Sequence, residues 1–99
     1  MVLGVASWYS EVDPGVPAYT ASGRRFDSSQ LWAASWDYPL GTRLRVTRPR
    51  TARSVEVVVM DRGPAEHLNR TLDLTKAAFS RIAHPGEGII NVEITQISD

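Results

Sequence analysis

Acidic residues are the strongest candidates for chemistry in this chain of 99 residues. Asp61 directly follows the most apolar segment, within Met60–Pro64. A carboxyl group at the mouth of a buried strand is partly desolvated, which tends to raise its pKa and suits it to proton transfer. The same position is also typical of a carboxylate that fixes a turn through backbone amides or pairs with Arg62. The spacing alone leaves these interpretations open.

A second acid, Asp73, precedes apolar residues at positions 74, 77, 78 and 82, which nearly follow a helical stripe. This pattern predicts a short helix over Asp73–Ile82, capped by Asp73 or Thr75 and ended by Pro85-Gly86. A carboxylate at a helix start is stabilised as a cap and by the helix dipole. The sequence therefore favours a structural role for Asp73.

Other catalytic and metal-binding patterns are missing from the sequence. His67 and His84 have no ligand-spaced partner, so both are predicted to be surface residues. There is no glycine-rich phosphate loop and no serine in a nucleophile elbow. We therefore expect no metal and no cofactor.

Five arginines fall within eleven residues, at positions 43, 45, 48, 50 and 53, although the formal net charge of the chain is zero. Arg43 and Arg45 alternate with Leu44 and Val46, which is typical of the outer face of a half-buried strand. We accordingly expect no nucleic-acid partner.

The segments around the candidate acids and the arginines have patterns that mainly predict strands. With 42% hydrophobic and 22% charged residues and no cysteine, the chain is expected to form one globular domain, residues 1–99, without disulfides or a membrane span. In Ser54–Met60 the alternation places Val55, Val57 and Val59 on one face. Strands separated by Gly and Pro turns predict a small barrel or sandwich. The expected strands are Gly4–Tyr9, Leu31–Trp36, Thr42–Thr47, Ser54–Met60 and Ile90–Ile94.

Aromatic residues are concentrated in the first forty positions: Trp8, Tyr9, Trp32, Trp36 and Tyr38. They can form core, or they can form a platform that stacks on sugar rings. The core interpretation is favoured for Trp32, and both remain open for Trp8, Trp36 and Tyr38.

Five motifs in order resemble the RlpA-like (rare lipoprotein A) family, over about Gly4–Ile97. They are Gly4–Tyr9, Thr20–Gly23 with Phe26-Asp27, Ala33-Ala34 with Pro39–Thr42, Asp61–Pro64 after Val55–Val59, and Leu72–Thr75. The resemblance implies a mainly β fold, a six-stranded double-psi β-barrel with one or two short helices. The same barrel occurs in expansins and barwin-like proteins.

This resemblance implies cell-wall chemistry. Some bacterial members are lytic transglycosylases, in which the sugar's own 6-hydroxyl attacks and one carboxyl group acts as acid and then base. Asp61 matches the functional Asp of that family, and Asp73 matches a second functional acid of expansin-like domains. The resemblance further implies substrate contacts, for which the candidates are Trp8, Tyr9, Thr20, Ser22, Asp27, Ser35, Trp36 and Arg62.

Two positions depart from the family pattern, because Arg24 stands where glutamate is usual and Ser35 where histidine is usual. The alternatives are therefore a non-catalytic, expansin-like polysaccharide-binding module, or a barwin-like protease inhibitor acting through Glu11–Ala18 and Glu66–Thr71. The expected partner is the glycan strand of peptidoglycan, bound by a monomer. The expected location is secreted, periplasmic or anchored at the outer membrane, with any export signal outside this chain.

Overall fold

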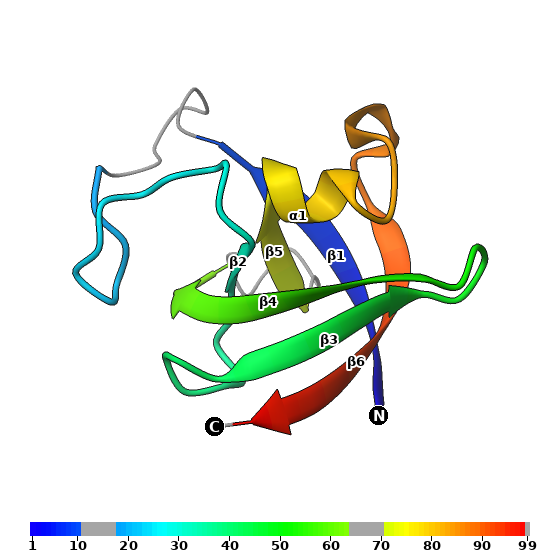
Figure 1. The fold of residues 1–99 in the computed structure, drawn as a ribbon, viewed down its shortest axis with the longest axis horizontal. Coiled ribbons are helices and arrows are strands. Elements are labelled where there is room, and N and C mark those ends of the chain that lie inside the picture. The colour runs from blue at the N-terminus through cyan, green and yellow to red at the C-terminus, as the bar shows by residue number, and fades with distance from the viewer. Residues whose placement is uncertain (11–17, 64–70, 99) are drawn as a thin grey trace.

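The chain folds into a closed barrel of six strands, seen in Figure 1. The computed structural model describes residues 1–10, 18–63 and 71–98. The order of strands around the barrel is β1-β5-β2-β4-β3-β6. The elements are β1 (Val2–Tyr9), β2 (Trp32–Ala34), β3 (Arg43–Arg48), β4 (Arg53–Asp61), β5 (Leu72–Thr75), α1 (Lys76–Ser80), a 3₁₀ turn (Pro85–Glu87) and β6 (Ile90–Ser98).

Two strand pairs, β1 with β5 and β2 with β4, are parallel, and the other four pairs are antiparallel. The first and last strands close the barrel, with Val2 opposite Ile94 and Ala6 opposite Ile90. Closure gives each of the six described strands a neighbouring strand on both sides. The predicted six-stranded, mainly β barrel is thereby confirmed.

Alternating residues of the strands fill the barrel interior. In β4, Val55, Val57 and Val59 are buried as predicted, whereas Val58 is half-buried on the outer face. Helix α1 packs onto the barrel (Figure 1), where the side chains of Ala78 and Phe79 are completely buried in the main core.

The predicted helix over Asp73–Ile82 is wrong at its start, because Leu72–Thr75 forms β5 and the helix begins at Lys76. Leu72 and Leu74 are both fully buried, so this segment alternates like a strand. The apolar positions fit the period of a strand and the period of a helix equally well. Pairing with β1 and β2 makes this segment a strand. Thr75 caps the helix as predicted, through an N–H from Ala78, and Asp73 lies inside the strand.

A second apolar cluster covers part of the outer barrel surface. It contains Tyr9, Phe26, Trp32 and Ala34, with Val58 and Met60 packed against it. The rings of Tyr9 and Phe26 stack with their centroids 4.8 Å apart. Trp32 is buried here, as the core interpretation predicted. This cluster fixes the segment before β2 against strands β1, β2 and β4.

No helix within the described residues is long and apolar enough to cross a membrane.

Candidate functional site

The two candidate acids lie in one row across four neighbouring strands. Ser7 of β1 is opposite Asp73 of β5, Asp73 is opposite Ala34 of β2, and Ala34 is opposite Asp61 of β4. Directly paired residues on neighbouring strands share a face of the sheet. Neighbouring strands lie about 4.8 Å apart, so the Cα atoms of the two acids are separated by about 10 Å.

A bulge turns Asp61 toward the outer face. Ala33 pairs with Val59, but the next residue, Ala34, pairs with Asp61, so Met60 is an extra residue in β4. Without the bulge, strict alternation would place Asp61 on the same side as the buried Val59. A bulge that redirects a side chain is a recurrent feature beside functional sites.

The Asp61 carboxylate is anchored by one oxygen. Its Oδ1 accepts the backbone N–H groups of Ala21 at 2.9 Å and Arg62 at 2.8 Å. Its Oδ2 takes part in no hydrogen bond among the described residues. Asp61 therefore fixes the turn through backbone amides, which is one of the two structural interpretations of its position. Its second carboxylate oxygen can accept a hydrogen bond or a proton from a ligand.

Arg62 and Ser35 hold the turn that carries Trp36. The Arg62 Nη1 group donates to the backbone oxygens of Ser35 at 2.9 Å and Tyr38 at 2.5 Å. Ser35 is fully buried, and its Oγ accepts the N–H of Asp37. Arg62 is absent from the ion pairs among the described residues, so pairing with Asp61 is not observed. A direct contact of Ser35 with a ligand would require this turn to open.

Asp73 is half-buried in β5, where Ser7 Oγ donates to its Oδ1 at 2.8 Å. Sequence reasoning did not identify Ser7. The available signal was its alternation with Tyr9 on β1, which places both side chains on the face opposite Ala6 and Trp8. The expectation that Asp73 serves as a helix cap is wrong, because the capping side chain is that of Thr75.

Tyr9 belongs to the outer apolar cluster, which also contains Ala34, the residue paired with both acids. Its side chain is only 9% exposed, and its hydroxyl is buried without a hydrogen-bond partner among the described residues. Burial, followed by the negative charges of Asp61 and Asp73, raises the pKa of Tyr9 well above its ordinary value. The phenol therefore stays protonated and lies within electrostatic reach of both carboxylates.

The loop before β2 is fixed by its own polar side chains. The hydroxyls of Thr20 and Ser22 are 2.7 Å apart, and Thr20 Oγ1 donates to the backbone oxygen of Arg24 at 3.0 Å. Asp27 accepts the N–H of Ser29 and the side chain of Gln30, and the hydrogen bonds from Ser29 hold its pKa below the usual range. Asp27 is thus a turn residue. A cleft of about 400 Å³ beside this loop is lined by Arg24, Arg25, Phe26, Asp27, Gln30 and Trp32.

Trp8 faces away from the acids. Its indole N–H donates to the backbone oxygen of Pro85 at 2.8 Å, and the Lys76 ammonium lies 5.7 Å from its ring centroid. It also packs against the main core. These contacts make Trp8 an anchor for the segment before β6, so it is not brought together with Asp61.

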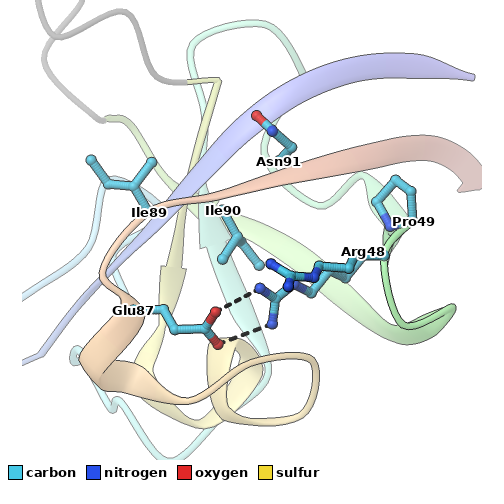
Figure 2. A pocket seen from close by; sticks show the side chains of 7 residues that line it. Arg48, Pro49, Glu87, Ile89, Ile90 and Asn91 are labelled. Carbon is cyan, nitrogen blue, oxygen red and sulfur yellow. Dashed lines mark hydrogen bonds and ion pairs between the residues drawn. The ribbon is translucent and has the colours of Figure 1, made fainter.

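Among the described residues, three of the five clustered arginines belong to two separate ion-pair groups. Arg43 and Arg45 are exposed on β3 and share Glu56 of β4. Arg48 makes two hydrogen bonds with Glu87, at 2.6 and 2.9 Å, which are visible in Figure 2. These contacts hold the pKa of Glu87 below its usual range.

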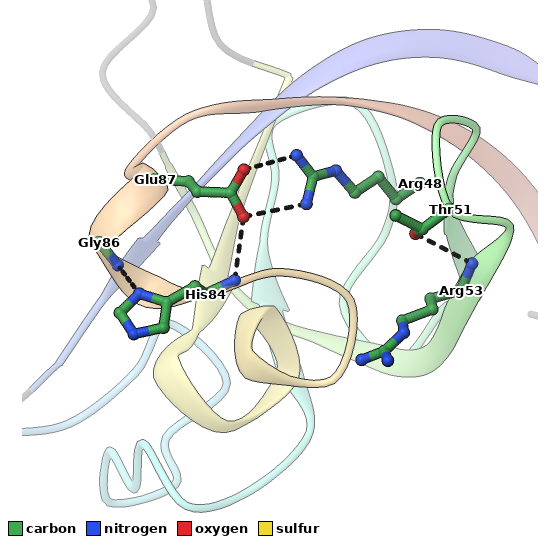
Figure 3. A network of polar contacts seen from close by, with 6 residues as sticks. All are labelled: Arg48, Thr51, Arg53, His84, Gly86 and Glu87. Carbon is green, nitrogen blue, oxygen red and sulfur yellow. Dashed lines mark hydrogen bonds and ion pairs between the residues drawn. The ribbon is translucent and has the colours of Figure 1, made fainter.

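The Arg48–Glu87 pair lines a cleft of about 680 Å³ (Figure 2). Glu87 also accepts the N–H of His84, whose ring accepts the N–H of Gly86, as Figure 3 shows. His84 is exposed, as predicted, and His67 lies outside the described residues. Asp61 ends β4 and Arg53, which pairs with Arg48, begins it, so these two ends of β4 are about 26 Å apart.

Comparison with known proteins gives consistent similarities. The family described as lytic transglycolase matches residues 1–94. A probable endolytic peptidoglycan transglycosylase RlpA from Nostoc sp. is 40% identical over 91 residues, which are 92% of this chain and 24% of that protein. The chain therefore spans about a quarter of the length of that relative.

Two solved structures resemble the barrel over nearly its whole length. An expansin from Clavibacter michiganensis has a TM-score of 0.73 at 25% identity, covering 98% of this chain and 50% of the expansin. A Streptomyces papain inhibitor has a TM-score of 0.71 at 25% identity, covering 95% of this chain and 93% of the inhibitor.

Proposed function

Because this chain belongs to the lytic transglycolase family of RlpA-like double-psi β-barrels, we propose that it cleaves the glycan strands of peptidoglycan. The observation that carries the proposal is the row that brings Asp61 and Asp73 to one outer face, with Asp61 anchored through a single oxygen. A carboxyl group held in this way has a defined orientation and one oxygen that can exchange a proton.

Asp61 acts as acid and then as base in this proposal. Protonated at Oδ2, it gives its proton to the glycosidic oxygen while the bond from that oxygen to C1 breaks. The resulting carboxylate then takes the proton of the sugar's own 6-hydroxyl as O6 bonds to C1, which leaves a 1,6-anhydro end. The proton returns to Asp61, so the cycle is balanced and consumes no water.

Asp73 supports this reaction electrostatically. Cleavage of a glycosidic bond passes through a transition state with oxocarbenium character, whose positive charge a nearby carboxylate stabilises. The hydrogen bond from Ser7 fixes the Asp73 carboxylate in its orientation. Trp36 is 54% exposed on the turn held by Arg62, which suits its ring to stacking on a sugar.

Incubation with purified peptidoglycan tests the proposal, with anhydro-muropeptides detected by mass spectrometry. We expect Asp61→Asn to lower product formation about 100-fold or more, because it removes the proton-transfer group. The matched control is Asp37→Asn, which makes the same change at an exposed neighbouring acid and is expected to retain activity. Wild-type activity in Asp61→Asn would refute the assigned role.

A non-catalytic glycan-binding module is the second candidate function. The positions that depart from the family pattern favour it, since Arg24 is exposed in the loop before β2 and Ser35 is buried in a turn. This candidate predicts that the protein sediments with insoluble peptidoglycan, chitin or cellulose and releases no product. An absence of binding to all three polymers would count against both candidates.

Protease inhibition is a third candidate, suggested by the similarity to the papain inhibitor. The loops predicted to carry it, Glu11–Ala18 and Glu66–Thr71, lie outside the described residues except at Ala18 and Thr71. A papain inhibition assay tests it directly, and absence of inhibition at micromolar protein removes it. Export from the cytoplasm and a monomeric state remain part of the proposed function, and size-exclusion chromatography checks the latter.

A further inference from the structure

Tyr9 presents a polar group that the free protein leaves unused. Its hydroxyl is buried and has no partner among the described residues. A buried hydroxyl without a partner lowers stability. Phenylalanine would fill the same space in the stack with Phe26 without that penalty. Such an orphaned group calls for a functional explanation.

Tyr9 packs in one cluster with Ala34, whose register pairs it with both Asp61 and Asp73, and the negative charges of these two acids act on the phenol. The two acids differ in their available oxygens. Asp73 has the hydrogen bond from Ser7 and a further interaction, whereas Oδ2 of Asp61 has no hydrogen bond among the described residues. The phenol is a donor and this oxygen is an acceptor, so the two unused groups are complementary.

We propose that Tyr9 is a positioning residue for Asp61, whose hydroxyl donates to Oδ2 when a glycan covers the site. Asp61 is half-buried in the free protein, which leaves its carboxylate open to solvation by water. A bound glycan displaces that water, and in the ionised form of Asp61, the form that acts as base, an unsolvated charge in a drier site needs a donor. Hydrogen bonds at functional sites commonly tighten in this way only in the complex.

This inference rests on the proposed glycan binding, but it does not require cleavage. The test is a double-mutant cycle on the affinity for soluble peptidoglycan glycan strands, measured by calorimetry with wild type, Tyr9→Phe, Asp61→Asn and the double variant. We expect Tyr9→Phe to weaken binding about tenfold when Asp61 is present and less than about twofold when Asn replaces it. We also expect the melting temperature of Tyr9→Phe to equal or exceed that of the wild type, because no hydrogen bond of the free protein is lost.

The control is Tyr19→Phe, which removes the hydroxyl of an exposed tyrosine and should change neither affinity nor melting temperature. An equal loss of affinity in both Asp61 backgrounds, or no loss at all, would overturn the assignment of Tyr9. Binding without anhydro products would instead defeat only the proposed cleavage, because the cycle still reports on Tyr9. If wild type binds no glycan strand, glycan binding and this inference both fall.

Discussion

Replacing Thr75 by valine tests how the strand that carries Asp73 is joined to its surroundings. The Thr75 hydroxyl is fully buried at the junction of β5 and α1. It donates to the backbone oxygen of Gln30 at 2.5 Å and accepts the N–H groups of Trp32 at 3.3 Å and Ala78 at 3.4 Å. Valine keeps the shape and removes all three contacts.

The magnitude follows from those contacts. Loss of the helix cap costs about 1 kcal/mol, and loss of the buried hydrogen bond to Gln30 costs about 1 kcal/mol more. We therefore expect Thr75→Val to lower the free energy of unfolding by about 2 kcal/mol. For a domain of this size, that corresponds to a fall in melting temperature of about 8–16 °C. Circular dichroism during thermal and urea denaturation measures both quantities.

Two further variants separate the hydroxyl from the methyl group. Thr75→Ser keeps the hydroxyl and loses one buried methyl, which costs about 0.8 kcal/mol. Thr95→Val makes the same substitution at an exposed position of β6 and should change stability by less than about 0.5 kcal/mol. If Thr75→Val were no more destabilising than Thr75→Ser or Thr95→Val, the reasoning from the hydroxyl contacts would be refuted.

Two other substitutions test the fold away from the acids. Gly4→Ala places a Cβ atom 2.6 Å from Thr71 Oγ1. We therefore expect the free energy of unfolding, measured by urea denaturation, to fall by about 1–3 kcal/mol. An unchanged midpoint would show that the Thr71 side chain moves aside without cost. Glu87 has its pKa lowered, first by the hydrogen bond from Arg48, so its stabilising effect is present above the ordinary glutamate pKa and is lost as pH falls through the lowered value. The melting temperature of Glu87→Gln should therefore lie below wild type at about pH 7, and the two should approach each other as the pH falls through the lowered pKa of Glu87. A difference that stays constant as the pH is lowered would contradict the role of the carboxylate charge.

The strand pattern was predictable because it depends on local alternation. Val55, Val57 and Val59 are buried as the period of two requires, and Arg43 and Arg45 are exposed. The start of the helix was predicted wrongly, because Leu74 and Ala78 satisfy the strand and helix periods together. Only pairing with β1 and β2, which are distant in sequence, makes Leu72–Thr75 a strand.

The sequence by itself determined the barrel family, the strands and the identity of the two candidate acids, because motifs and periodicity are properties of neighbouring residues. Tertiary structure alone decided how those acids are arranged. The register of four strands places Asp61 and Asp73 in one row, and an extra residue at Met60 turns Asp61 outward. The tertiary structure also decided that the Tyr9 hydroxyl is a donor without a partner, within electrostatic reach of the two acids. Burial and missing partners arise only when distant segments pack together.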